Sequence, residues 1–430
     1  MTDTTAPPEY RPEESFAREL DRGDELAPYR DAFHLPAGPD GEPLIYFAGH
    51  SLGLQPRRTR DLIERELDDW AELGVLGHQR AAHPWYSYHE NFRESGARLV
   101  GAEPGEVVMM NSLTVNLHLM LVSFYRPTPK RYKILMEAPA FSSDTYAVRT
   151  HLRHHGIDPD DGLVTIGPRD GEHWIRIEDI LGLLDEQGDR IATVMLGGVN
   201  FLSGQLFDMR RITAAAKSHG CMVGFDIAHA AGNAGLRLHE WDVDFAVWCN
   251  YKYVNAGPGS IAGCFINEKH AVDTERLRFG GWWGNDPESR FKLQLIPKYQ
   301  PVPSADGWQI SNPPIFAMTP LLASIALFDE AGMPALRRKS ERLTGYLEYL
   351  VDRMPGGRYE IITPRDPAQR GCQLSLLVHE NARECEQALE EAGVICDFRE
   401  PNVIRAAPTP LYNTFHEVWR FSRVLSAVGG

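Results

Sequence analysis

The segment DFAVWCNYKYVNAGPGSIAGCFI, residues 244–266, decides the fold. Two apolar, β-rich runs at 245–249 and 261–266 flank a polar loop that is interrupted by Gly and Pro and carries Lys252 between Tyr251 and Tyr253. A lysine at the end of a buried strand has lost solvent on at least one side, which favours the neutral amine that forms a Schiff base with an aldehyde. A surface lysine that merely follows a strand is the alternative, and Lys252 alone does not exclude it.

The upstream segment CMVGFDIAHAAG, residues 221–232, adds a second chemical group. An apolar strand ends there in Asp226, and small residues then begin a helix. Because ligands of open α/β sheets bind at the carboxyl ends of the strands, we expect Asp226 and Lys252 to meet at one crevice. Pyridoxal phosphate requires an acid for its pyridine nitrogen and a lysine for its aldehyde. A helix N-cap is the other interpretation of Asp226.

A phosphate site is the third element of this hypothesis. Residues 106–110 predict a strand, and NSLTVN, residues 111–116, then begins a helix whose free N–H groups and dipole suit an anion. Taken alone, this pattern is better explained by ordinary N-capping by Ser112 or Thr114. Phe141 follows another predicted strand, 132–137, and can stack on a flat ring.

Composition limits the class of protein. The chain has 430 residues and a net charge of −15 with no basic block, which argues against nucleic acid and membrane partners. No apolar run reaches the length of a membrane span, and the N-terminus lacks a signal-peptide pattern. Six cysteines without a CxxC pair favour reduced thiols. We therefore expect a soluble, cytoplasmic protein.

A metal site is the weaker interpretation of the histidine-rich segment RTHLRHHG, residues 149–156. No carboxylate is spaced with these histidines on the same face, and exposed histidines need no ligand. We predict no metal.

Strands and helices alternate through most of the chain, which predicts an α/β fold with a mostly parallel sheet covered on both faces. From residue 358 the pattern changes to that of a smaller α+β domain. We predict an N-terminal segment at 1–56 that packs with the small domain, a large domain at 57–320 and a small C-terminal domain at 321–430. The glycine patterns of a P-loop or a dinucleotide-binding turn are absent from the sequence.

Three further residues are candidates for substrate binding. Arg405 lies in the apolar run VIRAAP, and its guanidinium needs either a substrate carboxylate or a structural salt bridge. His78, in GHQRAAHPWYSYHE, can bind an aromatic or anionic substrate or belong to a packed aromatic loop. Ser51, in AGHSLGLQP, can contact a ligand or cap a turn.

Taken together, these motifs resemble the kynureninases, which are fold-type-I pyridoxal phosphate enzymes of the class V aminotransferase-like superfamily. The resemblance covers nearly the whole chain and rests on HSLGLQP, LTVNLHL, FDIAHA, NYKYVNAGPG, GWWG, ISNPPI, GCQLSL and VIRAAPTPLYNTFHE. It implies a large domain with a seven-stranded sheet, a small C-terminal domain, and a homodimer with its sites at the subunit interface. It also implies hydrolysis of the Cβ–Cγ bond of L-kynurenine, or of 3-hydroxy-L-kynurenine, to anthranilate or 3-hydroxyanthranilate and L-alanine. Such an enzyme is a hydrolase of carbon–carbon bonds in ketonic substances that serves tryptophan degradation and pyridine nucleotide biosynthesis.

The resemblance also implies roles for individual residues. Lys252 would hold the cofactor aldehyde, Asp226 would pair with the pyridine nitrogen, and Tyr251 would act in catalysis as a proton donor. The cofactor contacts would come from Leu113, Thr114, Phe141, Asp144, Asp226, His229, Tyr251, Lys252, Trp282 and Asn312. Substrate contacts would come from Arg405, His78, Asn312, Ser51 and Asn285.

The chain departs from the family at four positions. His50 stands where an Asn is usual, Ser142 where Pro is frequent, and Gly197 where some members have a cofactor-contacting serine. Asn285 stands where His is common, at a position thought to face the aryl group, which puts the preference between the two kynurenines in doubt.

Alternative functions follow from the same residues. The chain could act on another β-acyl amino acid, or be another fold-type-I enzyme such as an aminotransferase or a desulfurase, although a desulfurase needs a reactive loop cysteine and Cys372 lies in a strand-like run. A cofactor-binding regulator is a further class, but the short acidic N-terminus leaves no room for a DNA-binding module.

Overall fold

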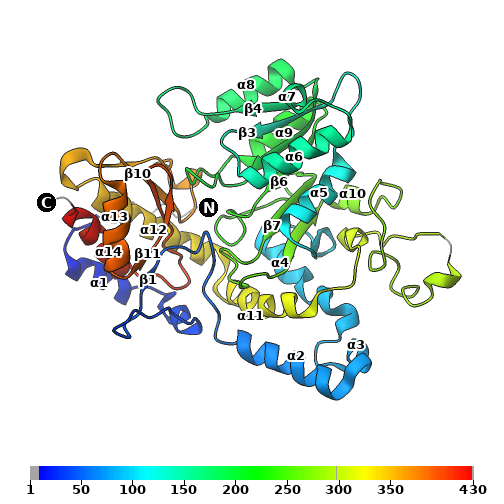
Figure 1. Cartoon of the computed structure of the whole chain (residues 1–430), viewed down its shortest axis with the longest axis horizontal. Coiled ribbons are helices and arrows are strands. Elements are labelled where there is room, and N and C mark those ends of the chain that lie inside the picture. The colour runs from blue at the N-terminus through cyan, green and yellow to red at the C-terminus, as the bar shows by residue number, and fades with distance from the viewer. Residues whose placement is uncertain (1–8, 297, 429–430) are drawn as a thin grey trace.

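The computed structural model describes residues 9–296 and 298–428, which form two domains side by side (Figure 1). The larger domain is built on a seven-stranded sheet of order β2-β8-β7-β6-β5-β3-β4. Its strands are β2 (Val107–Met109), β3 (Lys133–Glu137), β4 (Leu163–Ile166), β5 (Ile191–Gly197), β6 (Met222–Asp226), β7 (Phe245–Cys249) and β8 (Ala262–Ile266). All neighbouring pairs from β7 to β4 are parallel, whereas β8 is antiparallel to both β7 and β2. The prediction of a mostly parallel sheet is confirmed.

Apolar side chains on both faces of this sheet explain why helices pack on each face. In β7, Ala246 and Trp248 join one buried cluster, while Phe245 and Val247 join another, as the alternation of a strand requires. The helices of this domain include α2 (Thr59–Leu73), α4 (Arg93–Val100), α5 (Leu113–Phe124), α6 (Ser142–His154), α8 (Ile177–Gln187), α9 (Met209–Ser218) and α11 (Ile315–Ala331).

Two glycines allow aromatic side chains to lie flat on neighbouring strands of the sheet. A Cβ on Gly224 would lie 2.0 Å from the ring of Phe245, and a Cβ on Gly263 would lie 2.1 Å from that of Trp248. Any larger residue at either position would displace a ring from the core. The strand pair that leads to Lys252 therefore depends on these glycines.

The smaller domain contains a four-stranded antiparallel sheet of order β12-β13-β10-β9. Its elements are α12 (Met333–Val351), β9 (Tyr359–Ile361), β10 (Leu374–Val378), α13 (Ala382–Glu391), β11 (Val394–Ile395), β12 (Asp397–Arg399), β13 (Val403–Ala406) and α14 (Phe415–Ala427). The N-terminal segment joins it, because α1 (Glu14–Arg22) packs on α14 and β1 (Ile45–Tyr46) pairs with β11 (Figure 1).

The division between the two cores lies within α12. Phe328 and Leu336 pack in the core of the larger domain, whereas Leu343 and the buried residues after it pack in that of the smaller one. The predicted boundary at 320/321 falls inside α11, which packs against α2 and α4 of the larger domain. We therefore propose a boundary between Leu336 and Leu343, since an apolar helix belongs with the core that buries it.

Within the described residues, no single helix is long and apolar enough to cross a membrane. The pair α11 and α12 reaches the required length and composition only when the two helices are counted together across their 83° bend.

Candidate active site

Four adjacent parallel strands bring their carboxyl ends to one pocket in the larger domain. Glu137 ends β3, Gly197 ends β5, Asp226 ends β6, and Tyr251 and Lys252 follow β7. The pocket is lined by Leu113, Thr114, Glu137, Phe141, Ser143, Asp144, Gly197, Val199, Phe201, Asp226, Ala228, His229, Tyr251 and Lys252. This is the edge at which α/β sheets bind their ligands.

Lys252 presents a free amine to this pocket. Its side chain is buried, and its Nζ lies 5.6 Å from the ring centroid of Phe141 and 5.9 Å from that of Tyr251. Among the described residues, Nζ has no hydrogen-bond or ion-pair partner. The loop is held by Asn250, whose Nδ2 donates to Ile261 O at 2.8 Å, and by Asn255 N, which donates to Lys252 O at 2.9 Å. These bonds fix the backbone of the loop, and the amine that it carries is open to reaction.

Three buried carboxyl groups face the same pocket. The backbone N–H of Ala228 donates to Asp226 Oδ1 at 2.7 Å, which orients this carboxylate at the strand end. Burial raises the pKa of Asp144 well above its ordinary value, and the charge of Asp226 and a hydrogen bond with it raise that pKa further. Burial also raises the pKa of Glu137 to about 7, although both its oxygens accept from Gly197 N at 3.1 Å. A cation between these groups would relieve their repulsion.

The start of α5 offers an anion site beside the carboxyl groups. Leu113 and Thr114 are its first two residues, and both line the pocket. The N-cap residue Ser112 makes no side-chain capping hydrogen bond. The N–H groups of the first turn therefore remain available for a phosphate.

Together these groups fit pyridoxal phosphate. The amine of Lys252 suits its aldehyde, Asp226 its ring nitrogen, the start of α5 its phosphate, and Phe141 one face of its ring. The Nδ1 of His229 is buried and has no partner within the described chain, so a polar ligand is expected beside it.

Arg405 lies on β13 and is buried; it contacts the pocket residue Phe201 but does not line the pocket itself. Its Nε donates to Asp397 Oδ1 at 2.8 Å, and its Nη1 donates to the carbonyl oxygen of the pocket residue Phe201 at 2.6 Å. The salt bridge that the sequence left as one of two alternatives is therefore present. Its partner Asp397 also binds Arg399.

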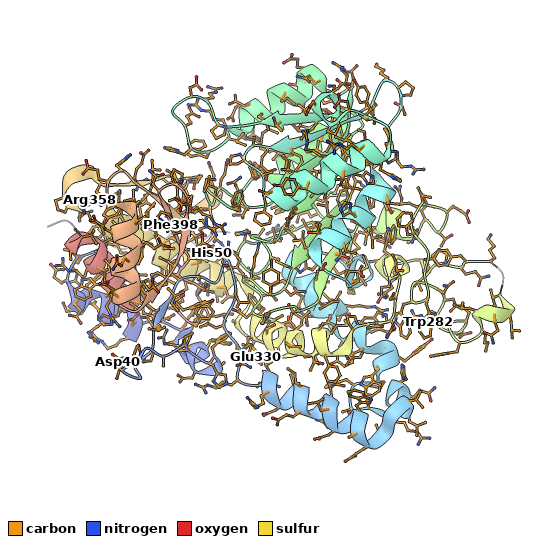
Figure 2. All side chains as sticks on the ribbon, viewed as in Figure 1. Asp40, His50, Trp282, Glu330, Arg358 and Phe398 are labelled. Atoms are coloured by element: carbon orange, nitrogen blue, oxygen red, sulfur yellow. The ribbon has the colours of Figure 1, made fainter. Side chains whose placement is uncertain are left out.

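Besides Arg405, five of the predicted site residues do not line this pocket. Ser51, Trp282 and Asn312 are exposed, and His78 is half-buried with its Nδ1 3.0 Å from Val75 O. Asn285 is buried, but its amide is engaged by its own loop: Nδ2 donates to Gly281 O at 2.7 Å, and Oδ1 accepts from Gln300 N at 3.2 Å. Figure 2 places Trp282 well away from His50, which lies between the two domains.

Known proteins with closely similar sequences decide the family. The family model described as the kynureninase C-terminal domain matches residues 336–425. The chain is 56% identical to the kynureninase of Myxococcus xanthus over 98% of both chains, and 53% identical to that of Koribacter versatilis over 95% of this chain and 96% of the relative. The kynureninase of Rattus norvegicus is 46% identical over 97% of this chain and 93% of its own.

The chain belongs to the kynureninase family. Solved structures of other proteins share the fold of this kynureninase family member. A cysteine desulfurase from Thermococcus onnurineus superimposes with a TM-score of 0.73 at 19% identity, covering 89% of this chain and 94% of the desulfurase. A mutant of C-DES described as carrying glycine covalently linked to its PLP cofactor gives 0.74 at 17% identity, with 92% and 98% covered. The predicted fold type is confirmed.

The chemistry of Cys372 does not favour a desulfurase. Its thiol is fully buried, and burial raises its pKa to about 12, so it carries little of the reactive thiolate. It lies two residues before β10, in a bend rather than inside the strand.

The sequence interpretation missed Glu137 and Asp397. Glu137 had a signal, because it is an acid that ends an apolar strand just as Asp226 does. Asp397 had none, since its pairing with Arg405 depends on the register of β12 against β13.

Proposed function

We propose that this chain hydrolyses the Cβ–Cγ bond of L-kynurenine or 3-hydroxy-L-kynurenine, and yields anthranilate or 3-hydroxyanthranilate together with L-alanine. The observation that carries the proposal is the free amine of Lys252 in a pocket with Asp226 and the start of α5, in a chain about half identical to kynureninases over nearly its whole length. A β-acyl amino acid with another aryl group is the second candidate, because the amide of Asn285 is turned into its own loop.

Bound pyridoxal phosphate would supply an aldehyde for the substrate amine and an electron sink for the bonds broken next to it. Lys252 would release the aldehyde to the substrate, and its freed amine would then take the proton from the substrate α-carbon. Asp226 would keep the ring nitrogen protonated. The carboxyl group of Asp144, whose pKa is raised, would share a proton with Asp226 rather than add a second negative charge.

The later steps involve water and one more proton. Water adds to the aryl ketone of the substrate, and cleavage of the Cβ–Cγ bond leaves the acyl carbon as the carboxylate of anthranilate. The β-carbon must then accept a proton to become the methyl group of alanine. Tyr251 is the proposed donor: it lines the pocket beside Lys252, and burial raises the pKa of its phenol above its ordinary value, which keeps it protonated. Arg405 would hold the α-carboxylate, which fixes the breaking bond relative to the cofactor ring.

We further propose a homodimer in which Trp282 and Asn312 complete the pocket of the partner subunit. Both side chains are exposed and outside the pocket of their own chain. The segment after α10 (Glu268–Ala271) extends from the larger domain (Figure 1) and exposes Val272, Leu277, Phe279, Phe291 and Leu295. Exposed apolar side chains gathered in one segment support an interface there.

A cytoplasmic location is part of the proposal. Its support is the six free cysteines, five of which are buried, as suits a reducing compartment.

The test is product analysis with the cofactor-loaded protein and each kynurenine in parallel. We expect the aryl acid and L-alanine in equal amounts from at least one of them. A yellow, cofactor-loaded protein that releases neither product would overturn the kynurenine assignment and leave the second candidate.

A further inference from the structure

The turn that contains His50 connects the pocket to the smaller domain. Ala48 forms a bridge with Ala407, directly after β13, while the N–H of Gly53 donates to Tyr251 O at 2.8 Å in the lysine loop. Figure 2 shows His50 between the two domains. The turn therefore touches the loop of Lys252 on one side and the strand of Arg405 on the other.

Three buried side chains at this place have polar atoms without partners. Within the described residues, neither Nδ1 nor Nε2 of His50 makes a hydrogen bond, and the same holds for His229 Nδ1 and Tyr253 Oη. The ring of His229 lies 6.4 Å from that of His50 and 6.1 Å from that of Tyr253. His50 has no exposed surface at all. Because buried polar groups without partners are costly, a ligand with hydrogen-bonding atoms is expected here.

The charges around these side chains select an anion. Burial lowers the pKa of His50 and of His229 well below the ordinary value, and the positive charges of Arg405 and Lys252 lower both further. Arg405 also acts on Tyr253, where its charge opposes the rise in pKa that burial causes. Neutral hydrogen-bond donors that face two cations suit a carboxylate.

We propose that His50 is a substrate-binding residue that donates a hydrogen bond to the α-carboxylate of the amino acid, beside Arg405. The inference rests on the proposed function in that it takes the substrate to be an α-amino acid. His229 lines the cofactor pocket, and the ring of His50 lies 6.4 Å from that of His229, in the turn between the domains. An asparagine amide, usual in the resembling family at this position, would donate the same hydrogen bond.

The test compares ligands with and without a carboxylate on the cofactor-loaded enzyme. The variants are His50→Leu, which removes the donor, and His50→Asn, which keeps one. Binding of L-alanine and of kynuramine, the kynurenine analogue without the α-carboxylate, is followed by the visible absorption of the cofactor, and cofactor affinity is measured separately. We expect His50→Leu to weaken L-alanine binding by about 10- to 100-fold, with kynuramine and cofactor binding changed less than about threefold. His50→Asn should retain L-alanine binding within about threefold.

Equal weakening for L-alanine and kynuramine would overturn the proposal, and so would unchanged L-alanine binding in His50→Leu. If the leucine variant does not fold, the same comparison of L-alanine with kynuramine binding is made with His50→Ala. Failure of the proposed function is a separate result. A wild type that binds L-alanine but does not cleave L-kynurenine contradicts that function, while the effect of the His50 variants on L-alanine and kynuramine binding can still be measured.

Discussion

At the scale of single residues, burial makes Glu137 a group that titrates near neutral pH. Burial raises its pKa from 4.5 to about 7, so the folded protein binds this proton more tightly than the unfolded chain does between those values. Stability that depends on the proton is present at low pH and is lost as the pH rises through 7. A cation bound beside Glu137 would stabilise its carboxylate and so lower this pKa.

We predict that Glu137→Gln removes this pH dependence. As the pH rises from 5 to 8, the free energy of unfolding of the wild type should fall relative to that of the variant by up to about 3 kcal/mol. Urea unfolding of the cofactor-free proteins measures this, with Glu391→Gln at the exposed end of α13 as the matched control. Parallel pH profiles for Glu137→Gln and the wild type would contradict the assignment.

Lys252→Ala tests the amine itself. Without it, the substrate α-proton has no base at this position, and turnover of L-kynurenine should fall roughly 10³-fold or more. Initial rates of anthranilate release measure the effect, and added primary amines such as ethylamine should restore part of the rate. A rate near that of the wild type would remove Lys252 from the mechanism.

The sequence predicted some of these site residues and not others. Lys252 and Asp226 end or follow apolar strands, so local pattern alone predicts that they lie at one edge of a sheet. The salt bridge between Arg405 and Asp397 depends on the register of two paired strands, and the polar space around His50 depends on contacts between the domains; no local pattern records either.

At the scale of elements, the loop that carries Asn285 acts as a scaffold. The amide of Asn285 joins Gly281 O to Gln300 N, and this holds both ends of the segment around Trp282. We predict that Asn285→His lowers kcat/KM for L-kynurenine and 3-hydroxy-L-kynurenine together, by roughly tenfold, because the hydrogen bonds of the side-chain amide to Gly281 O and Gln300 N are lost. A large fall for only one of the two substrates would instead assign Asn285 to direct aryl recognition.

The element pattern predicted the large sheet well because its central strands, such as β7 with the buried run FAVWC, are apolar on both faces. The domain boundary at 320/321 stays a prediction, because the pattern is helical on both sides of Gly332 and does not mark where one core ends. Only packing shows that α11 and the start of α12 belong to the larger core.

At the scale of the whole molecule, the proposed dimer would share each site between two subunits. Lys252→Ala damages the pocket of its own chain, whereas a Trp282→Ala, Asn312→Ala double variant would damage that of the partner. Each variant alone should be nearly inactive. We predict that an equal mixture, dissociated and reassociated, regains about a quarter of wild-type activity, because half the dimers then carry one intact site out of two.

A mixture that gains no activity over the separate variants would place Trp282 and Asn312 in their own chain's site. The control is the same mixture without dissociation, in which the subunits have not been exchanged.

The most direct test of the central claim is cleavage of L-kynurenine by the cofactor-loaded protein in water labelled with ¹⁸O. The proposed hydrolysis predicts equal amounts of anthranilate and L-alanine. The carboxylate of anthranilate should carry the labelled oxygen, and the L-alanine should carry no more label than an amino acid kept in the same water without reaction. Intact kynurenine, or an aryl product without the equivalent of L-alanine, would contradict it.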